Sequence, residues 1–213
     1  YACTRVGGDP RNTGTRAFTG GGNSASVRFE NYHDRFLYWT SSNGPPLTST
    51  FTIAFWQRAY SCNNNQIPVY IRRTNGDWGY MVDSYRSAGA VLWTSNGGIR
   101  FERNSGSQYC NSVTNVWHHY IIVSDGSSRR FSYYYDGQAQ SFTSHNWQDF
   151  SGWYLNSLGS KAYRRDGHSS WGSNALGGYL DEFILWNRAI SATEARALYT
   201  LRGRNIRYAN NFV

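Results

Sequence analysis

The sequence lacks long apolar runs and is poor in residues that favour helices. No stretch of its 213 residues approaches 18 consecutive apolar residues, the length at which a segment becomes a candidate membrane-spanning helix. We therefore expect no membrane span. Methionine occurs once, and lysine, glutamate and leucine are scarce. Because these residues favour helices, we do not expect a mainly helical fold.

Lysine is nearly absent, although the chain is basic. Lys161 is the only lysine among 21 basic residues, and the formal net charge is +8. Arginine binds carboxylate, sulfate and phosphate groups through two parallel N–H groups, and it also stacks on aromatic rings. The doublets Arg72–Arg73, Arg129–Arg130 and Arg164–Arg165 therefore predict an anion-binding rim; the alternative is a solvated surface without a ligand. The charges are scattered and no recognition motif accompanies them, so we expect no nucleic-acid partner.

Patterns of catalytic residues are absent as well. The sequence contains no Gly-x-Ser-x-Gly nucleophile elbow, no zinc-ligand spacing and no phosphate-binding loop. A glycosidase needs two carboxylates roughly 5–10 Å apart in one cleft, whereas Asp181 and Glu182 are expected on opposite faces of a strand. His118 and His119 are expected in a central strand, with one of them facing inward as a hydrogen-bonded core or interface residue. We therefore expect a protein that is not an enzyme.

Cysteines are few, and N-glycosylation sequons do not occur. Cys62 and Cys110 each follow a tyrosine closely and precede an asparagine, between expected strands. We expect a disulfide between them, as in extracellular proteins; two unrelated buried thiols are the alternative. Cys3 is then free or pairs with another cysteine or another chain. The missing sequons favour a prokaryotic or viral surface protein, and we expect an extracellular location, secreted or on a cell or virion surface.

Aromatic residues and turn signals are plentiful. Phe, Trp and Tyr make up 17% of the chain. The turn signals Asn75–Gly76, Asn96–Gly98, Asp125–Gly126 and Asp136–Gly137 recur between short β-prone runs, which is typical of β-hairpins. A domain of this length buries roughly 70% of its unfolded surface. The sequence therefore predicts an all-β domain with a continuous core.

A strand followed by a short helix is predicted near the C-terminus. The apolar run from Leu180 to Trp186 follows a Gly-Gly break and reads as a buried strand. Ser191 and Glu194 have the spacing of a capping box, in which each satisfies a backbone N–H group of the helix start. The helix would turn an apolar face of Ala195, Leu198 and Tyr199 toward the domain.

This ending resembles that of laminin-G-like jelly-roll domains, the concanavalin A-like sandwiches that include the pentraxins. Phe51–Trp56, after an opening strand Val27–Tyr32, resembles an early strand of the family. Val116–Val123 with a hairpin at Tyr135–Gly137 resembles its central strand pair. The resemblance covers residues 21–203 and implies an antiparallel two-sheet jelly-roll sandwich with one short C-terminal helix.

Two terminal segments lie outside the expected sandwich. Residues 1–20 are rich in glycine, threonine and arginine and are expected to form an arm or connector. Residues 204–213 form a short basic tail.

The irregular segment 143–178 is the strongest candidate for a ligand site, because long loops of β-sandwiches often carry function. A sugar presents apolar C–H faces ringed by hydroxyls, so its site needs a flat aromatic ring beside polar hydrogen-bonding groups. A hairpin near residue 77 offers the same mixture. The alternative is that the tryptophans point inward and fill the core. The expected ligand contacts are Trp147, Asp149, Trp153, Arg164, Arg165, His168 and Trp171, together with Asp77 and Trp78.

The family resemblance also implies a structural calcium ion. Many relatives hold calcium with oxygens near the first and last strands, which points here to Glu30, Asp34 and Asp181. The family has Asp-Gly after its first strand, whereas this chain has Glu30-Asn31. Alternatively, Asp181 and its neighbour Glu182 pair with arginines at a strand edge.

Together these features predict a non-catalytic extracellular recognition module that binds a glycan or a glycosylated surface, with a preference for acidic or sulfated sugars. An acidic polysaccharide is the expected partner. The alternative is a structural, adhesive or attachment module of a viral or cell-surface assembly. In that case the aromatic loop and the termini would contact other subunits, in a homo-oligomer or a larger complex.

Overall fold

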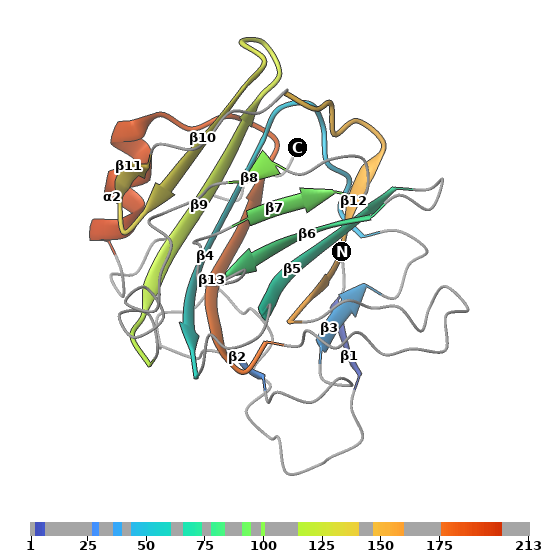
Figure 1. The fold of residues 1–213 in the computed structure, drawn as a ribbon, viewed down its shortest axis with the longest axis vertical. Helices are drawn as coiled ribbons and strands as arrows, with labels where there is room; N and C mark the ends of the chain where they lie inside the picture. Colours follow the sequence, from blue (N-terminus) through green and yellow to red (C-terminus); the bar gives the residue numbers. More distant parts are fainter. Residues whose placement is uncertain are drawn as a thin grey trace.

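The computed structural model describes residues 3–6, 27–29, 36–39, 44–60, 66–73, 78–83, 91–94, 99–100, 115–140, 147–159 and 176–201. Of these, residues 3–6, 27–28, 36–39, 66, 78–83, 91–94 and 99–100 are described by their backbone alone. Within these ranges the chain forms two antiparallel sheets and one helix (Figure 1). The predicted two-sheet fold with a short C-terminal helix is confirmed.

One sheet contains seven strands in the described residues, all paired antiparallel. In spatial order they are β1 (Cys3–Val6), β3 (Phe36–Trp39), β12 (Trp153–Leu158), β5 (Gln66–Arg73), β6 (Trp78–Asp83), β7 (Val91–Thr94) and β8 (Ile99–Arg100). β5 to β8 follow one another in the chain, whereas β12 joins them to β3 through pairing between segments distant in sequence.

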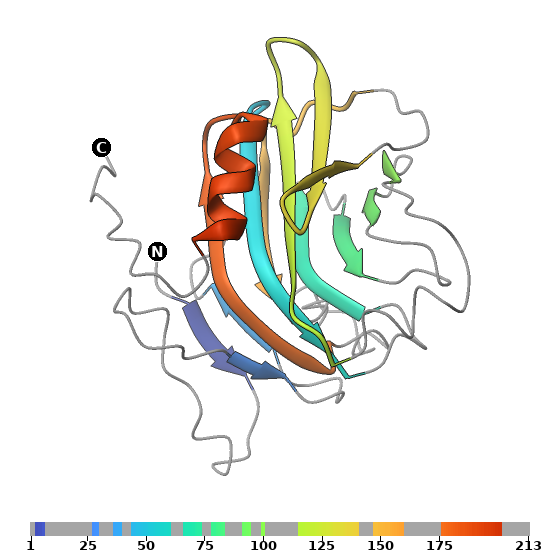
Figure 2. The ribbon, with the colours of Figure 1, turned by 90° about the vertical axis from the view of Figure 1, so that its left-hand side faces the viewer.

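The other sheet contains six strands in the described residues. In spatial order they are β11 (Gln138–Gln140), β10 (Arg130–Tyr135), β9 (His118–Asp125), β4 (Phe51–Ala59), β13 (Gly178–Trp186) and β2 (Val27–Phe29). The long strands β9, β4 and β13 lie side by side at its centre (Figures 1 and 2). These three strands include most of the segments that resemble the laminin-G-like domains.

Strict alternation of side chains makes β4 a two-faced strand. Phe51, Ile53 and Phe55 point into the space between the sheets, where they join the main hydrophobic core. Ala54 lies on the opposite face and belongs to a second apolar cluster. Because successive side chains of a strand point to opposite faces, one apolar segment supplies both clusters.

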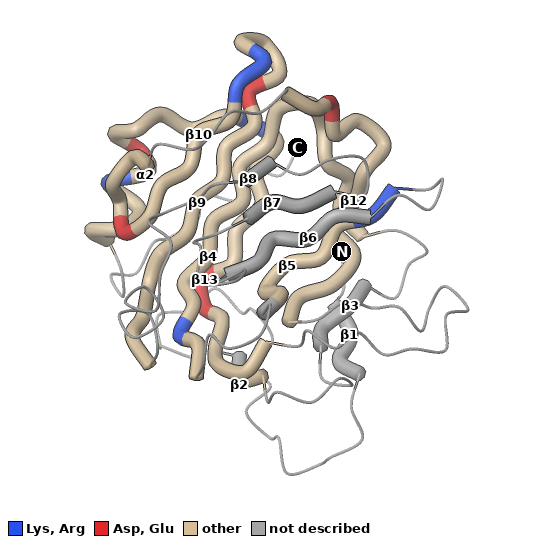
Figure 3. Tube along the Cα trace, viewed as in Figure 1, with Lys and Arg blue, Asp and Glu red and all other residues tan. Residues whose placement is uncertain are grey.

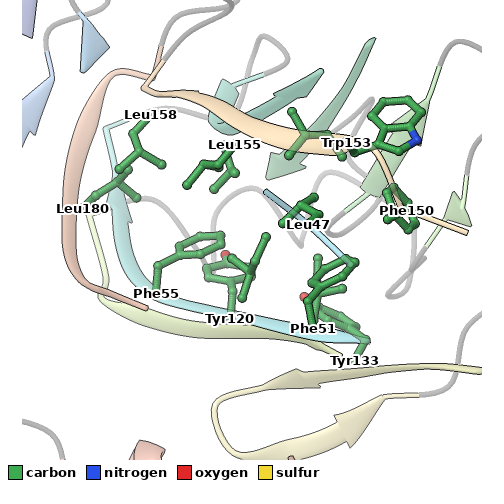
Figure 4. Close-up of a cluster of buried hydrophobic side chains, with 14 of the residues drawn as sticks. Leu47, Phe51, Phe55, Tyr120, Tyr133, Phe150, Trp153, Leu155, Leu158 and Leu180 are labelled. Atoms are coloured by element: carbon green, nitrogen blue, oxygen red, sulfur yellow. The ribbon is translucent and has the colours of Figure 1, made fainter. Parts of the chain in front are cut away.

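The main core lies between the two sheets. Side chains from β4, β9 and β10 meet side chains from β12 and from the segments before it (Figure 4). Aromatic rings meet edge to face at several points: Phe150 contacts Phe51 at 5.4 Å and Phe131 at 6.0 Å between ring centroids. Such edge-to-face pairs add stabilisation beyond the area they bury.

Helix α2 (Ala192–Thr200) packs on the outer face of the six-stranded sheet (Figure 2). The Ser191 hydroxyl accepts a hydrogen bond from the Glu194 N–H at 3.2 Å, and the Glu194 carboxylate accepts one from the Ser191 N–H at 2.8 Å. The predicted capping box is therefore confirmed. Ala195 is buried and Leu198 packs beside it, as the predicted apolar face requires.

The predicted hairpin at Asp136–Gly137 is also confirmed. Both residues have positive φ, 49° and 72°, and they join β10 to β11. Asp-Gly suits such a turn because both central positions need left-handed backbone. Among the described residues, no helix has the length and apolarity needed to cross a membrane.

Several predictions fall outside the described residues. These are the Cys62–Cys110 disulfide and the C-terminal tail 204–213, and most of the arm 1–20 lies outside as well. Cys3 lies in β1, where the backbone alone is described.

Candidate functional site

Three of the predicted ligand contacts lie together, just before and at the start of β12. They are Trp147, Asp149 and Trp153. Of Trp78 the structure describes only the backbone, as the first residue of β6. The remaining predicted contacts, Asp77, Arg164, Arg165, His168 and Trp171, lie outside the described residues.

Trp153 belongs to the hydrophobic core. Its side chain is 1% exposed and packs against Phe150, with ring centroids 5.6 Å apart (Figure 4). Leu155, two residues further along β12, points into the same core. Strand alternation therefore turns Trp153 inward, and its ring offers no face to a ligand.

Trp147 stands between the core and the surface. Its half-buried ring packs against the main core, and the guanidinium carbon of Arg129 lies 5.9 Å from the ring centroid. Arg129 is exposed and occupies the left-handed backbone region, with φ of 52°, in the turn that joins β9 to β10. This contact joins the turn to the segment before β12.

Asp149 follows Trp147 by two positions in the sequence and carries an ionised carboxylate. Its Oδ1 accepts hydrogen bonds from the Ser151 N–H at 2.9 Å and from the Ser151 hydroxyl at 2.7 Å. These bonds, and the positive charge of Arg73, hold the pKa of Asp149 below its usual value. Oδ2 accepts no hydrogen bond from a described residue, so this oxygen is available to a ligand hydroxyl.

Arg129, Trp147 and Asp149 are called here the Trp147 site. Figure 3 shows basic residues at the tip of the β9–β10 hairpin and an acidic residue on the segment entering β12, at the same end of the sandwich. The site combines an aromatic ring, a cation and a carboxylate. This is the mixture of groups that a sugar-binding site needs.

A second group of side chains on the outer face of the six-stranded sheet was not predicted. It consists of Arg58, Tyr60, Trp117 and Tyr179 and is called here the Arg58 cluster. Arg58 and Tyr179 are cross-strand partners, and the guanidinium carbon lies 5.8 Å from the tyrosine ring centroid. Tyr60 meets the Tyr179 ring edge to face at 5.5 Å, and Trp117 lies at 6.1 Å.

The sequence did contain a signal for this cluster. Trp56, Arg58 and Tyr60 alternate with inward-facing residues at the end of β4. A charged residue in such a strand must leave the core, so the alternation places Arg58 between two aromatic residues on the outer face.

Beside the Arg58 cluster, helix α2 covers the same face of the sheet. Trp56 stacks on His119 at 4.8 Å, and Tyr199 of the helix stacks on Trp56 at 5.6 Å. Trp56 and His119 are each 3% exposed. The Arg58 cluster begins where this cover ends, and all four of its residues are only half-buried.

Asp181, a predicted calcium ligand, is the cross-strand partner of Trp56 and is half-buried. Its Oδ1 accepts a hydrogen bond from the Glu182 N–H at 2.8 Å. Among the described residues no three metal-ligating side chains come together. Glu30 and Asp34 lie outside those residues, so the calcium site stays a prediction.

His118 and His119 both bind Asp136 in the hairpin turn. The Nδ1 atom of His118 lies 2.7 Å from Oδ2 of Asp136, and the backbone N–H of His119 donates to Oδ1 at 2.8 Å. Burial raises the pKa of Asp136, but these hydrogen bonds outweigh it and hold the pKa below its usual value. The His118 ring also stacks on Tyr135 at 4.8 Å. This arrangement fastens a turn to a strand.

Comparison with protein families gives one match. The family model described as the concanavalin A-like lectin/glucanases superfamily matches residues 21–196. No curated protein matches the sequence.

Three solved structures illustrate the similarity of the fold. Domain 4 of AbnA, an extracellular arabinanase from Geobacillus stearothermophilus, in complex with arabinotriose, superposes with a TM-score of 0.65 at 15% identity, covering 92% of this chain and 87% of that one. A heptameric SAP-like pentraxin from Limulus polyphemus gives 0.53 at 14% identity, covering 79% and 81%. The CBM40 domain of IT-sialidase from Ruminococcus gnavus, bound to α2,3-sialyllactose, gives 0.50 at 13% identity, covering 72% and 84%. At these identities the likeness concerns the fold.

Proposed function

This chain belongs to the concanavalin A-like lectin/glucanases superfamily, and from that premise we propose that it is a non-catalytic extracellular module that binds a glycan. The superfamily includes both binding proteins and glucanases, so membership alone does not decide between them. The observation that carries the proposal is the Trp147 site, where the exposed Arg129 lies over the half-buried Trp147 ring and the exposed Asp149 follows two positions along the chain.

The three residues of the Trp147 site have complementary roles toward a sugar. The solvent-exposed part of the Trp147 ring would meet the apolar C–H face of a sugar ring. The free Oδ2 of Asp149 would accept a hydrogen bond from a hydroxyl, and the guanidinium of Arg129 would donate to an oxygen or an acidic group. None of these roles requires a chemical step.

Two of the similar structures support a saccharide as the ligand class. One was solved with arabinotriose and another with sialyllactose. The net charge of +8, carried almost entirely by arginine, supports an acidic or sulfated sugar over a neutral one, because arginine pairs well with carboxylate and sulfate.

The test is a glycan array with neutral, sulfated and uronic-acid oligosaccharides in the presence of calcium. We expect saturable binding to one glycan class, reduced about tenfold or more by Arg129→Ala or Asp149→Asn, since a hydrogen bond to a charged group is worth about 1.5–3 kcal/mol. Arg196→Ala removes one positive charge from the exposed face of α2 and should leave binding unchanged.

Two results would contradict the proposal. Binding to every polyanion that disappears in salt would mean that the arginines act only as a nonspecific field. No binding to any glycan would instead support a structural or attachment module.

A further inference from the structure

We propose that the Arg58 cluster is a second ligand site, which binds the carboxylate of an acidic sugar, a uronic or sialic acid. This inference rests on the proposed glycan-binding function. It assigns a ligand class to a surface that is separate from the Trp147 site.

The cluster stands on backbone that is held in place on three strands. It lies where β4 ends and where β9 and β13 begin. Beyond the paired strands, the Asn115 N–H donates to the Ala59 carbonyl at 2.7 Å, and the Tyr60 N–H donates to the Gly177 carbonyl at 2.8 Å. The side chains of the cluster are therefore presented from fixed positions, which lowers the entropic cost of binding.

Arg58 has no carboxylate partner among the described residues. Its Nε is buried and donates no hydrogen bond to them, while its guanidinium carbon lies near the Tyr179 ring. A buried donor without an acceptor costs roughly 1–3 kcal/mol, and more when it is charged. Because this nitrogen is itself shielded from solvent, an arriving anion would pair with the terminal N–H groups of the guanidinium.

Arg188 shows what the same arrangement looks like when the charge is satisfied. Its guanidinium carbon lies 5.6 Å from the Trp186 ring, much as Arg58 lies near Tyr179. However, Arg188 also forms an ion pair with Glu194 at 2.8 Å. Both arginines contact an aromatic ring, but within the described chain only Arg188 has a carboxylate. A ligand would supply the missing one at Arg58.

The rings around Arg58 provide an apolar surface for a sugar ring. Tyr60 and Trp117 each contact the ring of Tyr179, and all three residues are half-buried. Val116, next to Trp117 in the chain, is 48% exposed, the higher value of the two large hydrophobic side chains that stand out as exposed in the described part of the protein.

The charges nearby favour an anion with a single charge. One guanidinium binds one carboxylate through two parallel N–H groups. Asp181 lies on the same face of β13 as Tyr179, two residues further along, and Glu182 follows it. A polyphosphate or a heavily sulfated chain needs several cations together, whereas the Arg58 cluster has a single guanidinium. A single sugar carboxylate fits this balance.

The test is an NMR titration with methyl glucuronide, N-acetylneuraminic acid, glucose 6-sulfate and methyl glucoside, the last having the same ring without a carboxylate. We expect the two carboxylic sugars to shift the amide signals of Arg58 and Tyr179 and the indole signal of Trp117. Arg58→Gln should weaken this binding about tenfold or more, and Arg188→Gln should change it by less than about twofold.

Several outcomes overturn the inference. Equal binding of methyl glucoside would show that the site does not require a carboxylate. Equal binding of glucose 6-sulfate would show that it does not prefer a carboxylate to a sulfate. Shifts confined to the Trp147 indole would assign the ligand to the first site and leave the proposed function standing. If the signals of the Arg58 cluster do not shift in the unmodified protein, the inference is overturned. This outcome does not depend on whether a variant folds. A glycan array that is also blank would overturn the proposed function.

Discussion

At the scale of single residues, two tryptophans six positions apart in the chain have different surroundings. Trp153 is enclosed by the core, and its Nε1 donates to no described residue. Trp147 packs on the core with one side and meets Arg129 with another. The amino acid is the same in both places. The direction imposed by the backbone therefore decides whether the side chain is buried in the core or reaches the surface.

Replacing these tryptophans should therefore cost different amounts of stability. Trp153→Ala would leave a large cavity in the core and should lower the free energy of unfolding by about 3–5 kcal/mol. Trp147→Ala should cost less, because its ring is only partly buried. Urea unfolding followed by circular dichroism would measure both. Equal losses in the two variants would contradict this assignment.

Gly178 makes a second prediction at this scale. It has φ of 154°, and a Cβ at this position would overlap the carbonyl oxygen of Arg58. Gly178→Ala should therefore destabilise the protein by about 3 kcal/mol or more, through backbone strain and overpacking. It should also displace Arg58 and Tyr179.

Gly152 is the matched control for Gly178. It also has positive φ, 82°, but the nearest atom to an added Cβ is Arg73 Nε at 3.9 Å. Gly152→Ala should cost only the backbone penalty, about 1–2 kcal/mol. Thermal unfolding of both variants compares them, and a larger loss for Gly152→Ala would refute the steric argument.

At the level of secondary-structure elements, the capping box of α2 makes the stability of the protein depend on pH. Hydrogen bonds from Arg188 and from the Ser191 N–H lower the pKa of Glu194 from 4.5 to about 2. Because the pKa is lower in the folded chain, the contribution of this carboxylate is present above the unfolded value and is lost as the pH falls through about 2. The carboxylate is largely exposed, so solvent screening keeps the effect modest.

Glu194→Gln should reveal that dependence. The difference in unfolding free energy between the protein and this variant should be largest above about pH 5 and should shrink toward pH 2. Chemical denaturation at a series of pH values measures it. Arg196→Gln, on the same helix and without an ion pair to a described residue, should show a difference that does not change over this range. The idea fails if the two variants behave alike.

Elements with a local pattern were predictable from the sequence. The strand over Phe51–Ala59, the strand ending at Trp186 and the capped helix all follow from periodicity or from cap residues a few positions apart. The bulge in β13 was not predictable in this way. Glu182 has φ of 47°, and the register against β4 shifts between Asp181 and Ile184. The extra residue interrupts the simple alternation of side chains near Asp181 and Glu182. Its position depends on the pairing of β13 with β4, which the local sequence does not reveal.

In the whole molecule, one of the two candidate sites was predictable from the sequence and the other was not. Trp147 and Asp149 are two positions apart, so their shared place could be read from the chain. The Arg58 cluster draws on residues near 58, 117 and 179, which meet only through the pairing of β4 with β9 and β13. Neither composition nor spacing encodes that register directly, since it arises from long-range packing.

Strand β9 also fixes the distance between the two sites. Trp117 precedes its first residue, and Arg129 lies in the turn after its last. Eight residues of antiparallel strand span roughly 27 Å, and Figure 1 shows β9 running along most of its sheet. Ligands held at both ends would therefore be too far apart to share one short saccharide. One copy of the protein would instead cross-link two glycan chains, so that its avidity would depend on how densely those chains stand on a surface.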